Sequence, residues 1–185
     1  MEISKSPREW LKHPMGKFIL KAGLIYLVWE FFNSYMQGYA WFDRWWDQNI
    51  LGFFLQGILN ASEFTLRLLP YEVYREGIVL KLDGSPGVAV GPGCVGLGLM
   101  FAMAALIISY QGPWKKKLWF IPLGVSGIFA INVCRIVVLA LISKYNHHWV
   151  DFNHKYVFNT LVYCFIFFMW VMWVRHLEEP SRKAI

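Results

Sequence analysis

The chain has 185 residues, of which 57% are hydrophobic and 18% aromatic, and its mean hydropathy is +0.39. This composition excludes an ordinary soluble globular domain and predicts an all-α integral membrane protein. The formal net charge is +6, but the basic residues cluster beside apolar runs, so membrane topology explains them better than binding to nucleic acid.

Four segments have the apolar character of membrane crossings, each of which takes about 20 helical residues. They are approximately residues 18–40, 95–110, 118–143 and 156–174. The second is short, because 16 residues at about 1.5 Å each reach only about 24 Å, so it needs its flanks to span. The basic N-terminal stretch before the first run is followed by no small-residue cleavage site, so we expect that run to be a retained anchor.

Residues 48–69 are ambiguous, because a helix there would carry a polar stripe on one face. The stripe consists of Asn49, Gly52, Gln56, Asn60, Glu63 and Arg67. If this segment is an interfacial or re-entrant helix, ten of the eighteen Lys and Arg residues fall on one side of the membrane. The positive-inside rule then places both termini and the 115–117 lysines in the cytoplasm. A fifth crossing would separate the N-terminus from those lysines, so we expect four spans and one amphipathic helix that does not cross.

A small β-hairpin is predicted between this amphipathic helix and the second apolar run. The β-branched stretches 78–82 and 88–90 flank the sequence DGSPG, which has the chemistry of a turn. On the expected topology the hairpin lies on the extracytoplasmic side. There is no internal repeat or linker, so residues 1–185 are expected to form a single membrane-embedded domain.

Cys94 follows the hairpin in GPGCVGLGLM, at the outer boundary of the second run. The three cysteines are odd in number and widely spaced, so they form no CxxC pair and no complete disulfide framework. Cys134 and Cys164 stand among bulky apolar residues and are interpreted as small apolar fillers. Cys94 differs, because the four glycines around it leave the thiol uncrowded and a helix N-terminus favours thiolate. The alternative is a glycine-rich helix start without chemistry.

Asn132 and Arg135 share one helix face of the 118–143 run. An arginine near the bilayer centre costs about 2.5–3.5 kcal/mol, so it indicates a functional site or a paired ion, unless it snorkels to the headgroups. The neighbouring Asn132 favours a pocket inside the bundle. Three small residues would let other helices pack closely on this run, namely Gly124, Gly127 and Ala130.

His154 stands in NHHWVDFNHKYVFN, the expected outer loop before the last run. The spacing of His147, His148, Asp151 and His154 matches no metal signature, so we expect no metal and no cofactor. A histidine suits the role of general base for a nearby thiol. Cys94, Arg135 and a histidine together supply a nucleophile, an oxyanion-stabilising cation and a base, which are the parts needed for thiol acyl transfer. The sequence leaves open whether His147 or His148 takes the place of His154.

Three motifs, in this order, resemble the exosortase/archaeosortase family: GPGCVGLGLM, the N-x-x-R-[I/V] pattern in NVCRIV, and NHKYVFN. The resemblance covers about residues 70–175. The short chain and its last motif, rich in Asn, Tyr and Phe, look like the compact family members of Bacteroidetes-type bacteria. The resemblance implies that Cys94 is the nucleophile, Arg135 the transition-state stabiliser and His154 the third catalytic residue, with Asn132 in substrate binding or in support of Arg135. Val95 stands where the family often has Ser, which leaves the choice of substrate open.

The resemblance implies a membrane-embedded cysteine transpeptidase or protease in the bacterial inner membrane, with both termini cytoplasmic and the active site facing the periplasm. Its substrate would be an exported protein with a C-terminal sorting signal: a recognition motif, a transmembrane helix and a basic end. An amine-bearing lipid or glycan, or water, would resolve the thioacyl intermediate.

Other classes remain open. A non-catalytic membrane protein for assembly or for binding sorting signals fits the same hydropathy. A transporter is disfavoured because four spans show no inverted repeat, and a disulfide oxidoreductase because no cysteines are paired.

Overall fold

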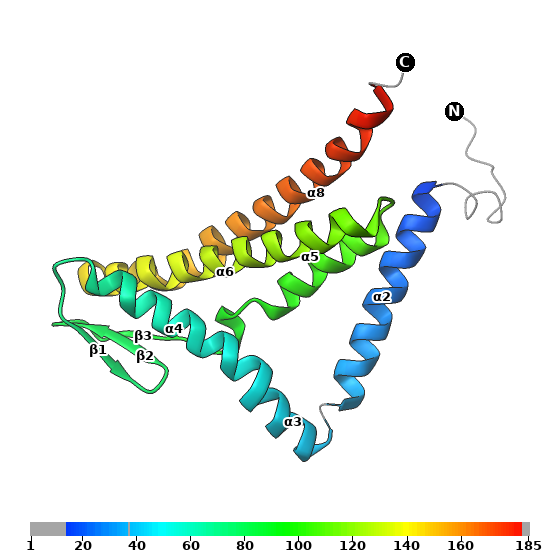
Figure 1. Ribbon diagram of the computed structural model, residues 1–185. Helices are drawn as coiled ribbons and strands as arrows, with labels where there is room; N and C mark the ends of the chain where they lie inside the picture. The colour runs from blue at the N-terminus through cyan, green and yellow to red at the C-terminus, as the bar shows by residue number, and fades with distance from the viewer. Residues whose placement is uncertain (1–13, 37, 183–185) are drawn as a thin grey trace.

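The computed structural model describes residues 14–36 and 38–182, and it is predominantly helical (Figure 1). The long helices are α2 (Pro14–Met36), α4 (Gly52–Arg67), α5 (Leu97–Ser109), α6 (Trp114–Tyr145) and α8 (Phe158–Arg182). Two short helices precede α4 and α8, each through a π-helical turn: α3 (Ala40–Trp46) with η1 (Asp47–Leu51), and α7 (Val150–Phe152) with η4 (Asn153–Val157). The predicted all-α membrane class is confirmed.

Within the described part of the chain, three helical stretches are long and apolar enough to cross a bilayer. They are Pro92–Ser109, Trp114–Tyr145 and Val150–Arg175, and they correspond to the second, third and fourth predicted runs. Helix α2 covers most of the first predicted run but is not among these stretches, and it carries the charged residues Lys17, Lys21 and Glu30. A total of four crossings therefore stays a prediction.

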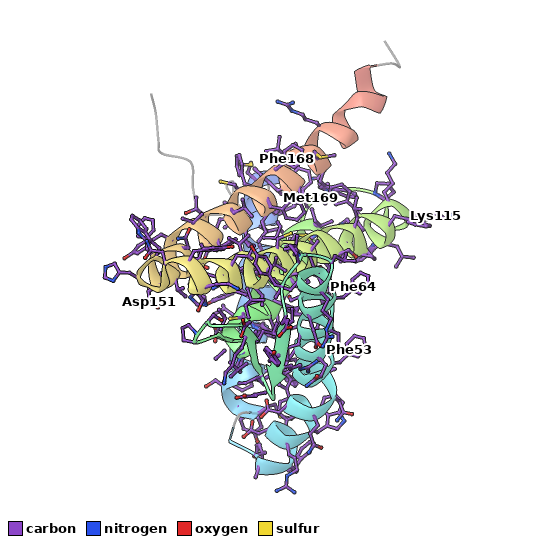
Figure 2. All side chains as sticks on the ribbon, turned by 90° about the vertical axis from the view of Figure 1, so that its left-hand side faces the viewer. Phe53, Phe64, Lys115, Asp151, Phe168 and Met169 are labelled. Atoms are coloured by element: carbon purple, nitrogen blue, oxygen red, sulfur yellow. The ribbon has the colours of Figure 1, made fainter. Side chains whose placement is uncertain are left out.

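The helices α5, α6 and α8 form a bundle, and α2 diverges from it (Figure 1). Helix α2 contacts α5 through aromatic pairs, including Trp29 stacked on Phe101 with ring centroids 4.1 Å apart. The start of α2, the α5–α6 turn and the end of α8 lie at one end of the molecule, and the β-sheet lies at the other. Figure 2 likewise separates Lys115 from Asp151.

The orientation relative to the membrane also depends on the N-terminal residues Lys5, Arg8 and Lys12 and on Lys183, which lie outside the described residues. The cytoplasmic placement of both termini, like the single domain over 1–185, stays a prediction.

Two glycines of α6 allow close packing, as the sequence predicts. A Cβ atom on Gly124 would lie 2.1 Å from Met103 Sδ of α5, and one on Gly127 would lie 2.2 Å from the Phe165 ring of α8. Ala130 is exposed, so the third small residue does not take part in this contact. Glycine therefore sets how near α5 and α8 approach α6.

The buried side chains form two clusters along the bundle. One is built by α5, α6 and α8 around Met103, Ile128 and Ile166. The other joins α4, the sheet and the C-terminal half of α6, and it includes Cys94 together with Ile136. The thiol thus lies in the cluster at the sheet end of the molecule.

The sheet is antiparallel in the order β1-β2-β3, formed by β1 (Val73–Glu76), β2 (Val79–Leu82) and β3 (Val88–Ala89). The β2–β3 pair confirms the predicted hairpin, with Leu80 opposite Val88. Strand β1 was not predicted. It pairs with β2 across a two-residue connection that starts at Gly77, whose φ of +61° suits glycine.

The predicted polar stripe of α4 attaches the helix to the sheet. Arg75 of β1 donates from Nη1 to Asn60 Oδ1 at 2.7 Å, donates from Nη2 to Gln56 Oε1, and lies 3.6 Å from the carboxylate of Glu63. On the other side of α4, Phe53 and Phe64 project away from the bundle (Figure 2) and are largely exposed. One side of α4 therefore contacts the sheet, and the opposite, aromatic side suits contact with lipid.

Candidate active site

Cys94 lies at the end of a separate 3₁₀ turn, η2 (Pro92–Cys94), and not in the first turn of α5 as the sequence suggests. The Cys94 amide donates to Gly91 O at 2.9 Å, and the Val95 amide donates to Pro92 O at 3.1 Å. Gly96 then adopts a left-handed conformation, with φ +72°, and α5 begins at the next residue. Cys94 itself is buried, with 6% of its surface exposed.

Among the four glycines around Cys94, Gly96 is the one with a clear structural requirement. A Cβ atom there would lie 2.7 Å from Asn132 Nδ2, whereas a Cβ atom on Gly91, Gly93 or Gly98 would meet no atom within 4 Å. Gly96 therefore leaves the room that the Asn132 amide occupies.

His154 belongs to the π-helical turn η4, within a continuous helix that starts at Val150. The sequence predicts an outer loop at this place, and the structure corrects that expectation. His154 Nε2 lies 3.6 Å from Cys94 Sγ, within hydrogen-bonding distance for sulfur, although 60 residues separate the two. π-Helical turns of this kind are frequent at functional sites because the extra residue redirects a side chain.

Arg135 faces the interior of the protein. It is 5% exposed, and its Nη2 donates to the main-chain carbonyl of His154 at 3.2 Å. This placement excludes snorkelling to the headgroups as the explanation of the charge. The guanidinium thus contacts the main chain of the residue whose imidazole meets the thiol.

The Arg135 side chain also has an unused donor. Its Nε is buried and finds no hydrogen-bond acceptor among the described residues. A buried N–H without a partner costs about 1–3 kcal/mol, and more when the group is charged. An acceptor oxygen within reach of Nε would remove this cost.

Asn132 is 1% exposed, and its Nδ2 donates to the carbonyl of Val95 at 2.9 Å. This contact is to the chain beside the nucleophile rather than to Arg135. The Asn132 and Arg135 side chains therefore hold two different main-chain carbonyls from one face of α6.

The other candidate histidine and cysteine side chains that the structure describes are exposed. His148 is exposed on the 3₁₀ turn η3 (His147–Trp149), and the His147 side chain lies outside the described ones. Cys134 and Cys164 are free and exposed on the surfaces of α6 and α8, whereas Cys94 is free and buried. Across the described residues, no three His, Cys, Asp or Glu side chains gather as metal ligands.

The fold is that of a helical membrane protein, and at one end of its bundle a buried thiol contacts an imidazole. These are side chains that a cysteine acyl-transfer site would need. The chain belongs to the transmembrane exosortase family, whose model matches residues 39–174. This is a family of membrane-embedded, sorting-related transpeptidases. The match begins before the resemblance noted in the sequence and includes α3, α4 and the sheet. No curated protein and no solved structure is significantly similar to the chain.

Proposed function

We propose that this exosortase cleaves the C-terminal sorting signal of exported proteins and acts through a thioacyl intermediate on Cys94. The observation that carries this proposal is the 3.6 Å contact between Cys94 Sγ and His154 Nε2, with the buried Arg135 guanidinium donating to the His154 carbonyl. The substrate would be a membrane-anchored protein with a recognition motif, a transmembrane helix and a basic end.

In the first half of the reaction, His154 accepts the proton of the Cys94 thiol. The sulfur attacks the carbonyl carbon of the scissile peptide bond, and the carbonyl oxygen becomes an oxyanion. The free Nε–H of Arg135 donates to that oxygen. The C–N bond then breaks, and the leaving amine of the C-terminal helix takes the proton from His154. A thioester on Cys94 remains.

In the second half, an amine-bearing lipid or glycan, or water, attacks the thioester carbonyl, and His154 takes its proton. The C–S bond breaks, and the proton returns to the thiol. An amine acceptor makes the enzyme a transpeptidase, whereas water makes it a protease.

The proposed orientation has the site facing the periplasm in the inner membrane of a bacterium, with both termini cytoplasmic. Two observations support it. The 115–117 lysines lie at the end of the bundle opposite the sheet and Asp151 (Figures 1 and 2), as the positive-inside rule favours for a cytoplasmic loop. The thiol lies in the cluster at the sheet end, near where the outer end of a substrate helix would emerge.

The test is to compare the membrane proteins of the native host carrying the wild-type chain, Cys94→Ala or Cys134→Ala. Cys134 is a matched control because it is a free thiol of the same chain on an exposed surface. We expect a set of exported proteins that lose their C-terminal helix in the wild-type and Cys134→Ala cells and keep it in Cys94→Ala cells, with all three variants inserted equally. Unchanged processing by Cys94→Ala would overturn the thiol mechanism and leave the non-catalytic alternative.

A further inference from the structure

The turn that carries the nucleophile is joined to α5 by two residues, Val95 and Gly96. Gly96 ends the 3₁₀ turn in a left-handed conformation, and its own carbonyl already accepts the amides of Leu99 and Met100 at the start of α5. A helical turn that ends in this way leaves a carbonyl at its C-terminal end without a partner in the helix. Here the Val95 carbonyl occupies that position, one residue from the thiol.

Asn132 supplies the missing donor. Its amide reaches the Val95 carbonyl at 2.9 Å from the buried face of α6. Water does not reach this depth readily, and an unpaired carbonyl in an apolar surrounding costs several kcal/mol on transfer scales, so the hydrogen bond restrains the turn strongly. The approach is so close that a Cβ atom at position 96 would meet the Asn132 amide at 2.7 Å.

The second contact of the same helix face restrains the base. Arg135, one turn after Asn132, holds the carbonyl of His154 at 3.2 Å. Helix α6 thus holds both partners of the thiol–imidazole contact by main-chain carbonyls. The Val95 carbonyl is next to Cys94 in the chain, and the other carbonyl belongs to His154 itself. The separation of these two side chains depends on both ties.

We propose that Asn132 is a positioning residue: by holding the Val95 carbonyl, it fixes the turn that places the Cys94 thiol against His154, and Gly96 is required so that this contact can form. Asn132 need not touch the substrate. This role differs from support of Arg135, because it acts on the nucleophile.

The direct test measures the contact between thiol and imidazole without any substrate. In a Cys134→Ala/Cys164→Ala background, Cys94 is the one thiol of the chain, and its alkylation by iodoacetamide can be followed against pH in membranes. We expect Asn132→Leu to give the same pH profile as His154→Ala, although the histidine is still present. Ser143→Ala is the control, because Ser143 is also buried on α6 and donates to the main-chain carbonyl of Gly87, in the connection between β2 and β3. It should keep the profile of the background protein.

A pair of glycine variants tests the same point if Asn132→Leu inserts poorly. Gly96→Ala adds one methyl group that meets the Asn132 amide, whereas Gly98→Ala adds the same group where no atom lies within 4 Å. Gly96→Ala should reproduce the His154→Ala profile, and Gly98→Ala should not. The proposal is wrong if Asn132→Leu and Gly96→Ala keep the background profile, or if Ser143→Ala and Gly98→Ala shift it equally.

A kinetic measurement adds a second readout and rests on the proposed function. Asn132→Leu should lower kcat by about 100-fold, as expected of a displaced nucleophile, with KM nearly unchanged. A raised KM at constant kcat would instead assign Asn132 to substrate binding. If the wild-type chain processes no substrate, the proposed function fails, while the alkylation profiles still decide the positioning role.

Discussion

The two halves of α6 contact their neighbours by different means. The N-terminal half approaches α5 and α8 through Gly124 and Gly127, where backbone and side chains meet without polar groups. The C-terminal half carries Asn132, Arg135 and Ser143, which donate to the carbonyls of Val95, His154 and Gly87.

The N-terminal half of α6 therefore serves mainly to pack the bundle, and the C-terminal half serves mainly to align the candidate site. Close packing fixes how near two helices lie, but it tolerates small displacements of a side chain. Hydrogen bonds from buried donors fix individual main-chain atoms at lengths of about 3 Å. Damage to the first half should therefore reduce the amount of folded protein, and damage to the second should reduce the activity of each folded molecule.

After Cys94→Ala, which removes the nucleophile, the largest effect is expected when the base is removed. His154→Ala should lower the rate of processing by about 10²–10⁴-fold, the usual contribution of a positioned general base, while the protein still inserts. The measurement is the initial rate of sorting-signal cleavage per molecule of folded enzyme. His148→Ala is the matched control, because that imidazole is exposed. Equal losses in both variants would show that the base is wrongly assigned.

Arg135→Lys should follow, with kcat lower by about 10²–10³-fold, the range seen when one oxyanion donor is lost. An ammonium group keeps the charge but not the planar set of donors that serves both the His154 carbonyl and a bound oxygen. Single-turnover cleavage rates measure this step. Full activity in the lysine variant would show that charge alone is needed.

Substitutions in the N-terminal half of α6 should instead lower the stability of the folded protein. Gly127→Ala places a methyl group 2.2 Å from the rigid Phe165 ring, and overpacking of this kind costs about 1–3 kcal/mol. Gly124→Ala should cost less, because the flexible Met103 side chain can move away. Thermal unfolding in detergent ranks the two, with Gly23→Ala as the control where no atom lies within 4 Å. If each folded Gly127→Ala molecule were also less active, the N-terminal half of α6 would align the site as well, which contradicts the proposed difference.

The smallest effect is expected for Ser143→Ala. Loss of its hydrogen bond to Gly87 should reduce the free energy of unfolding by about 0.5–1.5 kcal/mol and leave kcat unchanged. Denaturant or thermal unfolding together with the processing rate checks both parts. A drop in kcat comparable with that of Asn132→Leu would mean that the whole C-terminal half of α6, and not the two ties near the thiol, aligns the site.

Much of the fold could be predicted because apolar length and turn chemistry are local. The runs that became α5, α6 and α8, and the hairpin around the DGSPG turn, follow from the sequence directly. Strand β1 was missed because its stretch is charged, and Arg75 is paired there by α4 side chains that only the tertiary structure brings near.

The residues of the candidate site could be named, but their geometry could not be derived. Cysteine, arginine and histidine were singled out by depth and chemistry. Gly96, with its left-handed conformation, packs close to Asn132 of α6, which is 36 residues away in the sequence. The π-helical turn at His154 is held by Arg135 of α6, which is 19 residues away. Such positions have no local sequence pattern, so the role of Asn132 became visible only through its hydrogen bond.

The most direct measurement of the central claim is the chemical nature of the link between enzyme and substrate. Mass spectrometry of the enzyme isolated from acid-quenched cells should show Cys94 carrying the new C-terminal residue of a processed protein, in a bond that hydroxylamine cleaves. Active processing with no such thioester on Cys94 would contradict the mechanism, whatever the distance between the thiol and the imidazole.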